Sequence, residues 1–194
     1  ARRMAHAVWP HRARYVTPMA AVAGSVADEM LAAMIAGRTL DKAYVNNGGD
    51  IAFHLTPGQE LRAGLFVERL DGSVRLTFDS PVRGIATSGW GGRSFSLGIA
   101  DSVTVLARSA ADADAAATMI ANEVDADHWS IERVPARTLD PDSDLGDLLV
   151  TTKVGRLPVE IVSAALDRGA EEARRLRLGA ALCLQGDWRL SEAA

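Results

Sequence analysis

The sequence predicts one domain that contains both helices and strands, and three observations lead to this prediction. Residues 17–37 carry apolar side chains at helical spacing, and residues 110–124 do the same. Between them, the run from 51 to 80 is rich in strand-forming residues, and 102–106 is a β-branched strand that leads into the second helix. A chain of 194 residues that is 48% hydrophobic and 24% charged is long enough for one well-packed domain.

The first helix is marked at both ends. Thr17 can cap it, Pro18 fits the first helical position, and Gly37 can close it. Asp28 lies beside the apolar stripe, and the pattern leaves open whether it faces a ligand or the polar edge of the helix. The apolar stripe consists of Met19, Val22, Val26, Met30 and Ile35.

An unusual loop follows at residues 43–52. Asn46, Asn47, Gly48 and Gly49 tolerate positive φ and carry small or no side chains, and Asp50 comes directly after them. This run favours a backbone held open for a ligand, and a hairpin loop with a solvated carboxylate is the alternative. Further along, Asp71-Gly72 predicts the turn of a hairpin between strands at 62–70 and 73–78.

A second loop, residues 85–94, combines hydroxyls, three glycines and an arginine. Thr87 and Ser88 can donate hydrogen bonds, Gly89 leaves backbone N–H groups accessible, and Arg93 can bind two phosphate oxygens at once. Lysine is absent and the spacing differs from a Walker A loop. The composition therefore indicates a phosphate cradle, with a ligand-free glycine-rich loop as the alternative.

The helix at 110–124 carries the sharpest signal. Ser109 and Asp112 predict a capping box. Asp114 and Thr118 are four residues apart and so lie one turn apart on the same face, where they can hold Mg²⁺ against a phosphate. Asp112 and Asp114 could instead only complement the helix dipole.

Several functions are disfavoured by the rest of the sequence. A net charge of −4 gives no support for general nucleic-acid binding. Residues 18–35 are apolar, but Asp28 and Glu29 in their middle argue against a membrane-spanning helix. The single cysteine, Cys183, lies in an apolar strand and is expected to be buried. Gln185-Gly186-Asp187 follows that strand and is expected to turn the chain back. Residues 1–16 form a basic lead-in, read as solvated or as a phosphate-contacting arm.

The order of these motifs resembles the ApbE-like superfamily, the FAD:protein FMN transferases. The resemblance rests on Val45-Asn46-Asn47-Gly48-Gly49-Asp50-Ile51, Ala86-Thr87-Ser88-Gly89 and Ala113-Asp114-Ala115-Ala116-Ala117-Thr118, and it covers about residues 19–124. It is strongest to a short, functionally uncharacterised branch, where it covers nearly the whole chain. It implies a mixed or antiparallel α+β domain over 1–194 with a flavin-nucleotide cleft, and an N-terminal portion before Ala1.

By this resemblance, Asp114 and Thr118 would bind Mg²⁺. The cofactor, FAD or FMN, would contact Asp28 and residues of both loops. Asp101 is a candidate further metal ligand or base, so that Asp101 and Asp114 are the predicted catalytic residues. The predicted cofactor contacts in the loops are Asn47, Gly48, Gly49, Asp50, Thr87, Ser88, Gly89 and Arg93.

Two departures from the transferases shape the functional prediction. The His-x-x-Asp-Pro-x-Thr-Gly segment is replaced by residues 93–101, which contain no histidine, and an early Lys-Gly is replaced by Ala23-Gly24. The leading hypothesis is Mg²⁺-assisted binding of a flavin or nucleotide-like cofactor, with or without weak phosphoester cleavage. The alternatives are FMN transfer to a Thr or Ser of a partner protein and a non-catalytic scaffold. We expect a cytoplasmic protein with no nucleic-acid or membrane partner, and a homodimer remains open.

Overall fold

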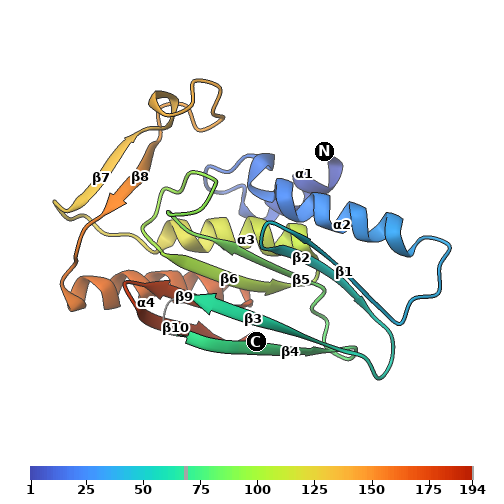
Figure 1. Cartoon of the computed structure of the whole chain (residues 1–194). Helices are drawn as coiled ribbons and strands as arrows, with labels where there is room; N and C mark the ends of the chain where they lie inside the picture. Colours follow the sequence, from blue (N-terminus) through green and yellow to red (C-terminus); the bar gives the residue numbers. More distant parts are fainter. Residues whose placement is uncertain (68–69, 194) are drawn as a thin grey trace. The chain divides into compact units, whose positions relative to one another are not determined.

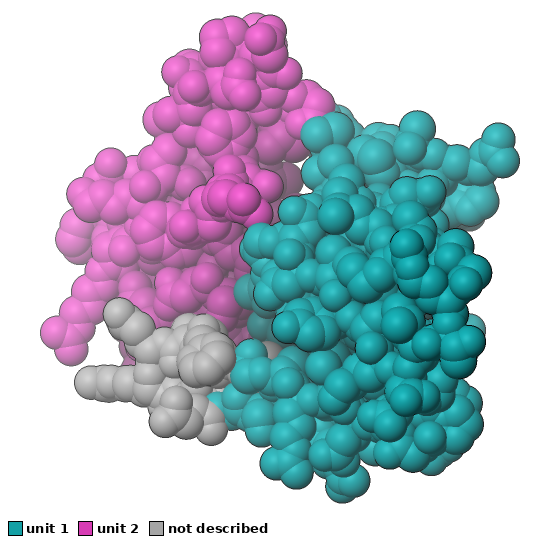
Figure 2. Space-filling view, turned by 45° about the vertical axis from the view of Figure 1, so that its right-hand side comes forward, with its two compact units in different colours: residues 1–87, 104–117 teal, residues 88–103, 118–194 magenta. Residues whose placement is uncertain are grey.

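The computed structural model describes residues 1–67 and 70–193 and confirms the α+β class. Helices pack with antiparallel pairs of strands (Figure 1). The chain divides into two compact units, shown in Figure 2: unit 1 is Ala1–Thr87 with Thr104–Ala117, and unit 2 is Ser88–Val103 with Thr118–Ala194.

Unit 1 holds most of the residues singled out by the sequence. Four of its strands are neighbours in the order β1-β2-β5-β6, and β3 pairs with β4. The elements that lie wholly or partly in unit 1 are α1 (Arg2–Val8), η1 (Trp9–His11), η2 (Pro18–Ala21), α2 (Val22–Ile35), β1 (Lys42–Asn47), β2 (Asp50–Leu55), β3 (Glu60–Val67), β4 (Leu70–Thr77), β5 (Gly84–Ser88), β6 (Ser102–Ala107) and α3 (Ala110–Glu123).

The first predicted helix forms in two parts. The Met19 amide donates to the Thr17 hydroxyl (3.3 Å), η2 follows, and α2 then continues to Ile35. The inner face of α2 packs on β1 and β2 (Figure 1). The buried residues of this contact are Ala27, Leu31, Ala43, Val45, Ala52 and Ala110.

The same segment corrects one exclusion made from the sequence. Pro18–Ile35 has a mean hydropathy of 1.3 and 28% of it is buried, so by length and composition alone it qualifies as a membrane-spanning candidate. The criterion allows two charged residues, so Asp28 and Glu29 do not exclude this segment. In this fold Asp28 is bonded to another helix of unit 1, as described below.

The loop at 43–52 is a tight hairpin. Asn47 pairs with Asp50, which leaves Gly48 and Gly49 as a two-residue turn with φ of 69° and 113°. Positive φ at both positions is the conformation that glycine tolerates best and that matches the twist of a hairpin. The Gly49 amide donates to the Asn46 side-chain oxygen (2.9 Å). The turn is therefore shorter than the four-residue loop that the sequence indicated.

The β3–β4 hairpin is confirmed, but its predicted turn is wrong. Asp71 and Gly72 lie within β4, where they pair with Phe66 and Leu65. β3 ends at Val67 and β4 begins at Leu70, and residues 68–69 lie outside the described residues. This register pairs Leu61 with Leu76, both of which pack in the core beneath the hairpin, and burial of one face fixes register more strongly than a local turn preference.

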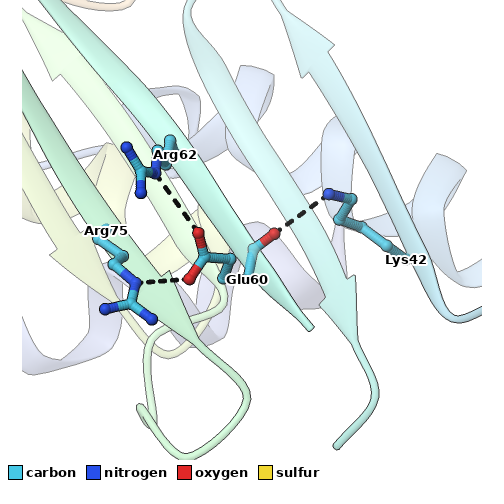
Figure 3. A network of polar contacts seen from close by, with 4 residues as sticks. All are labelled: Lys42, Glu60, Arg62 and Arg75. Carbon is cyan, nitrogen blue, oxygen red and sulfur yellow. Dashed lines mark hydrogen bonds and ion pairs between the residues drawn. The ribbon is translucent and has the colours of Figure 1, made fainter. Parts of the chain in front are cut away.

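Polar contacts secure the open end of this hairpin (Figure 3). Glu60 accepts hydrogen bonds from Arg75 (2.5 Å) and Arg62 (3.4 Å), and the Lys42 ammonium donates to the Glu60 carbonyl oxygen (3.1 Å). The hydrogen bond from Arg75 lowers the pKa of the Glu60 carboxyl. The network thus ties β3 to both β4 and β1.

Unit 2 is built around α4 and the hairpin of β9 and β10. In the turn between these strands, Gln185 and Gly186 have φ of 50° and 86°, which confirms the predicted turn. Cys183 is buried, as predicted. The elements that lie wholly in unit 2 are β7 (Ile131–Pro135), η3 (Ala136–Thr138), β8 (Leu149–Val154), α4 (Val159–Leu176), β9 (Gly179–Leu184) and β10 (Asp187–Ser191).

Candidate functional site

The N-terminus of α3 is capped twice. The Ser109 hydroxyl accepts from the Asp112 amide (3.1 Å) and donates to the Asp112 carboxylate (2.7 Å), which confirms a capping-box-like start of the helix. The Asp28 carboxylate, from α2, accepts from the amides of Ala110 (3.1 Å) and Ala111 (3.0 Å). Both oxygens of Asp28 are thus used within the fold. This geometry gives Asp28 a capping role, and the cofactor contact expected from the sequence stays a prediction.

Replacing Asp28 with alanine is expected to lower the free energy of unfolding by about 0.5–2 kcal/mol, because two amides at a helix N-terminus lose their acceptor. Glu29→Ala is the control, since Glu29 is exposed and its ion pair with Arg3 contributes only about 0–1 kcal/mol. Urea unfolding of both variants measures the difference. Equal losses in the two variants contradict a capping role for Asp28.

One turn into α3, two carboxyl groups meet. Asp114 accepts from the Gly24 amide (2.9 Å), and the side chain of Asp50, of which 6% is exposed, lies close enough to influence the pKa of Asp114. Burial raises the pKa of the Asp114 carboxyl, and interactions with Gly24, Asp50 and Ala23 only partly offset this. Two neighbouring carboxyl groups favour binding a proton or a cation, because two negative charges at short range repel each other.

The backbone around this pair is closely packed. A Cβ on Gly24 would lie 2.2 Å from the Ala110 carbonyl oxygen, so only glycine allows α2 to approach α3 this closely. The Asn47 side-chain amide donates to the Ala23 carbonyl oxygen (3.0 Å). These contacts fix α2, β1 and α3 of unit 1 around the carboxylate pair.

A pair of hydroxyl groups lies next to Asp50. The Thr87 amide donates to Asp50 (3.4 Å), and the hydroxyls of Thr87 and Thr104 are 2.8 Å apart. Thr104 is buried on β6, and sequence reasoning missed it because a threonine in a β-branched strand carries no motif signal. Every residue of β6 except Leu106 is buried, so alternation along the strand does not single out Thr104 either.

The donor set suits a hard cation such as Mg²⁺, because every candidate ligand atom is an oxygen. Within residues 1–67 and 70–193, no three or more His, Cys, Asp or Glu side chains gather as a metal site. Mg²⁺ commonly binds through one or two carboxylates and completes its shell with water and phosphate oxygens. Asp50 and Asp114 fit that pattern as the two carboxylate ligands. They do not fit a site in which protein side chains supply every ligand of the metal.

Gly48 and Gly49 form the β1–β2 turn of unit 1, and the other predicted site residues belong to unit 2. Asp101 accepts from the Trp90 indole and the Gln185 amide, and Gly89 packs against the Asp101 carbonyl. Arg93 is exposed. Ser88 begins the loop, and Thr118 follows Asp114 by four residues on α3. Asn47, Asp50, Thr87 and Asp114 are thus brought together in unit 1.

The model of a protein family described as AbpE bacteria matches residues 1–190. The chain belongs to this family. The assignment confirms the resemblance to the ApbE-like superfamily and to its short branch that the motifs predicted.

Curated relatives match this chain over part of their length. A UPF0280 protein of Methanoregula boonei is 37% identical over 161 residues, which is 78% of this chain and 65% of the relative. UPF0280 proteins of Methanothermobacter thermautotrophicus and Archaeoglobus fulgidus are 42% and 44% identical over 111 residues, which is 55% of this chain and 42% and 44% of those relatives. The chain therefore spans less than two thirds of these relatives.

A solved structure, the flavin transferase ApbE from Vibrio cholerae, aligns with a TM-score of 0.46 and 16% identity. The alignment covers 92% of this chain and 51% of the transferase.

Proposed function

We propose that this chain binds a flavin nucleotide, or a similar nucleotide-like cofactor, with the help of Mg²⁺. The observation that carries the proposal is the Asp50–Asp114 pair, two neighbouring carboxyl groups in unit 1, of which Asp50 is buried and Asp114 accepts from the Gly24 amide. The ligand class comes from the order of motifs shared with the ApbE-like superfamily.

Asp50 and Asp114 would hold the cation, which would neutralise the charge of a bound phosphate. The Gly24 amide already donates to Asp114 and keeps one of its oxygens oriented. Thr118 stays a predicted third ligand, because helical spacing puts it one turn beyond Asp114.

The Gly48–Gly49 turn supplies the surface that a ligand could approach. Both glycines are exposed, and a Cβ on Gly49 would meet no heavy atom within 4 Å. Asn47 is held by the Ala23 carbonyl and so fixes the end of β1. The Gly49 N–H already donates to the Asn46 side chain (2.9 Å), so a phosphate oxygen bound here would replace that side chain as the acceptor. In unit 2, Ser88, Gly89 and Arg93 stay predicted phosphate contacts.

Calorimetry tests the proposal directly. FAD titrated into the protein with MgCl₂ is expected to release or absorb heat with a saturable profile, and the signal is expected to vanish when EDTA replaces the metal. The same titration with FMN and ADP identifies which half of the dinucleotide is bound. No heat with any of the three, in MgCl₂ or in EDTA, contradicts the proposal.

Covalent flavin transfer is not expected. No histidine lies between Gly92 and Asp101, and Ala23 stands where the transferases have lysine. Incubation with FAD, MgCl₂ and a peptide that carries an acceptor threonine is therefore expected to give no fluorescent band on a denaturing gel. A band that depends on MgCl₂ supports FMN transfer instead.

A further inference from the structure

Asp101 connects two loops of unit 2 through its side chain. Its Oδ1 accepts from the Trp90 indole N–H (3.1 Å), and its Oδ2 accepts from the Gln185 amide (2.5 Å). Its own amide donates to the Cys183 carbonyl oxygen (2.9 Å). Both carboxylate oxygens are therefore bound to donors of the protein itself.

Gln185 extends this connection to a third segment. It lies in the β9–β10 turn, where its φ is 50°. Its side chain donates to the Gly155 carbonyl oxygen (2.7 Å) and accepts from the Leu157 amide (3.1 Å), so it fixes the segment between β8 and α4. Asp101 thus sits at the centre of a network that orders three loops.

The loop that carries Trp90 is fixed on its inner side. The Trp90 amide donates to the Ala100 carbonyl oxygen (2.9 Å), and the Gly92 amide donates to the Gly89 carbonyl oxygen (3.2 Å). A Cβ on Gly89 would lie 2.3 Å from the Asp101 carbonyl oxygen, so the loop backbone rests directly on Asp101.

The outer side of this loop is open. A Cβ on Gly91 would meet no heavy atom within 4 Å, and Arg93 is exposed. A loop whose inner side is bonded and whose outer side is free loses little conformational entropy when it binds a ligand.

We infer that Asp101 is a positioning residue: it holds the Trp90 loop, residues 88–94, in the conformation that receives the phosphate of the ligand. It acts through Trp90 and Gln185. This role replaces the metal ligand or base expected from the sequence, and for the class of ligand it rests on the proposed function.

Hydrogen exchange on the ligand-free protein tests the structural half of the inference. Asp101→Ala and Trp90→Phe are each expected to raise exchange at the Trp90 and Gly92 amides about ten-fold, the factor that corresponds to losing a charge-assisted hydrogen bond. Asp127→Ala is the control, because Asp127 is exposed on the same unit. Unchanged exchange in both variants contradicts the inference, whether or not FAD binds.

Calorimetry with FAD and MgCl₂ tests the part of the inference that concerns ligand binding. Asp101→Ala and Trp90→Phe are each expected to weaken binding several-fold, and the double variant is expected to be little weaker than Asp101→Ala alone, because Asp101→Ala already removes the Trp90 contact. Asp101→Asn, which keeps one acceptor, is expected to fall between the parent and Asp101→Ala.

A metal ligand gives a different pattern. If Asp101 is a metal ligand, the Asp101→Asn variant binds FAD as weakly as Asp101→Ala. The loss of affinity then adds to the loss caused by Trp90→Phe, and half-maximal FAD binding needs more Mg²⁺. That pattern overturns the positioning role. If the parent binds no FAD, the proposed function fails and the binding half of the inference with it, while the exchange result still decides whether Asp101 orders the loop.

Discussion

Replacing Gly24 with alanine is expected to lower the free energy of unfolding by about 1–3 kcal/mol, the range for forcing a group into a packed interior. The new Cβ would lie 2.2 Å from the Ala110 carbonyl oxygen and 2.8 Å from the Ala111 amide nitrogen. Since both neighbours are backbone atoms at the start of α3, α2 and α3 must separate. For a chain of this size the melting temperature is expected to fall by roughly 2–12 °C.

Gly91→Ala provides the matched control. It makes the same chemical change where a Cβ meets no heavy atom within 4 Å, so the melting temperature should stay constant or rise slightly. Because the Gly24 amide donates to Asp114, the Gly24 variant should also bind FAD and Mg²⁺ more weakly. Thermal melts of the two variants that shift equally contradict the close approach of α2 to α3.

The second large effect concerns Asp114. The parent is expected to gain about 2.7 kcal/mol from ligand at 100 times its dissociation constant. That gain corresponds to a rise in melting temperature of roughly 5–10 °C. Asp114→Asn keeps the shape of the side chain and removes the charge that Mg²⁺ requires, so most of this rise should disappear. Thermal melts with and without FAD and MgCl₂ measure it.

Asp112→Asn separates a binding role from a helix-dipole role. Asp112 is exposed in the first turn of the same helix, two residues from Asp114. A dipole contribution amounts to about 0.3–1 kcal/mol and does not depend on ligand. The Asp112 variant should therefore keep the full ligand-induced rise, and an equal rise in both variants removes Asp114 from the site.

Without ligand, Asp114→Asn should stabilise the protein increasingly as pH rises. Burial raises the pKa of Asp114 in the folded state above its unfolded value of about 3.9. The folded protein therefore favours the protonated carboxyl. The stabilisation that this protonation gives is fully present below about pH 3.9 and is lost as pH rises through the pKa of Asp114 in the folded state. The asparagine side chain of the variant stays neutral over this whole pH range. Urea unfolding of parent and variant at pH 4 and pH 7 should show the larger difference at pH 7.

Local rules predicted much of the fold. The caps at Thr17 and Ser109, the strand at residues 102–106 and the turn at Gln185-Gly186 each depend on a few adjacent residues, and each appears in the structure. The motif order also predicted the family correctly. Within unit 1, the helix and loop patterns selected Asp50 and Asp114 separately, and the fold brings them into contact.

Features that depend on tertiary contact escaped the sequence. Asp28 caps a helix that begins 82 residues later, and no local pattern specifies such a partner. The β3–β4 register follows burial rather than the Asp71-Gly72 signal. The β7–β8 pair was not predicted, because its strands are short and carry charged residues.

The central claim is that Asp50 and Asp114 bind a divalent cation together with the ligand. Mn²⁺ prefers the same oxygen ligands as Mg²⁺ and can be followed by electron paramagnetic resonance. In the presence of FAD, the parent and Asp112→Asn are expected to bind about one Mn²⁺ per chain, whereas Asp50→Asn and Asp114→Asn bind far less. Equal Mn²⁺ binding by all four proteins would contradict the account.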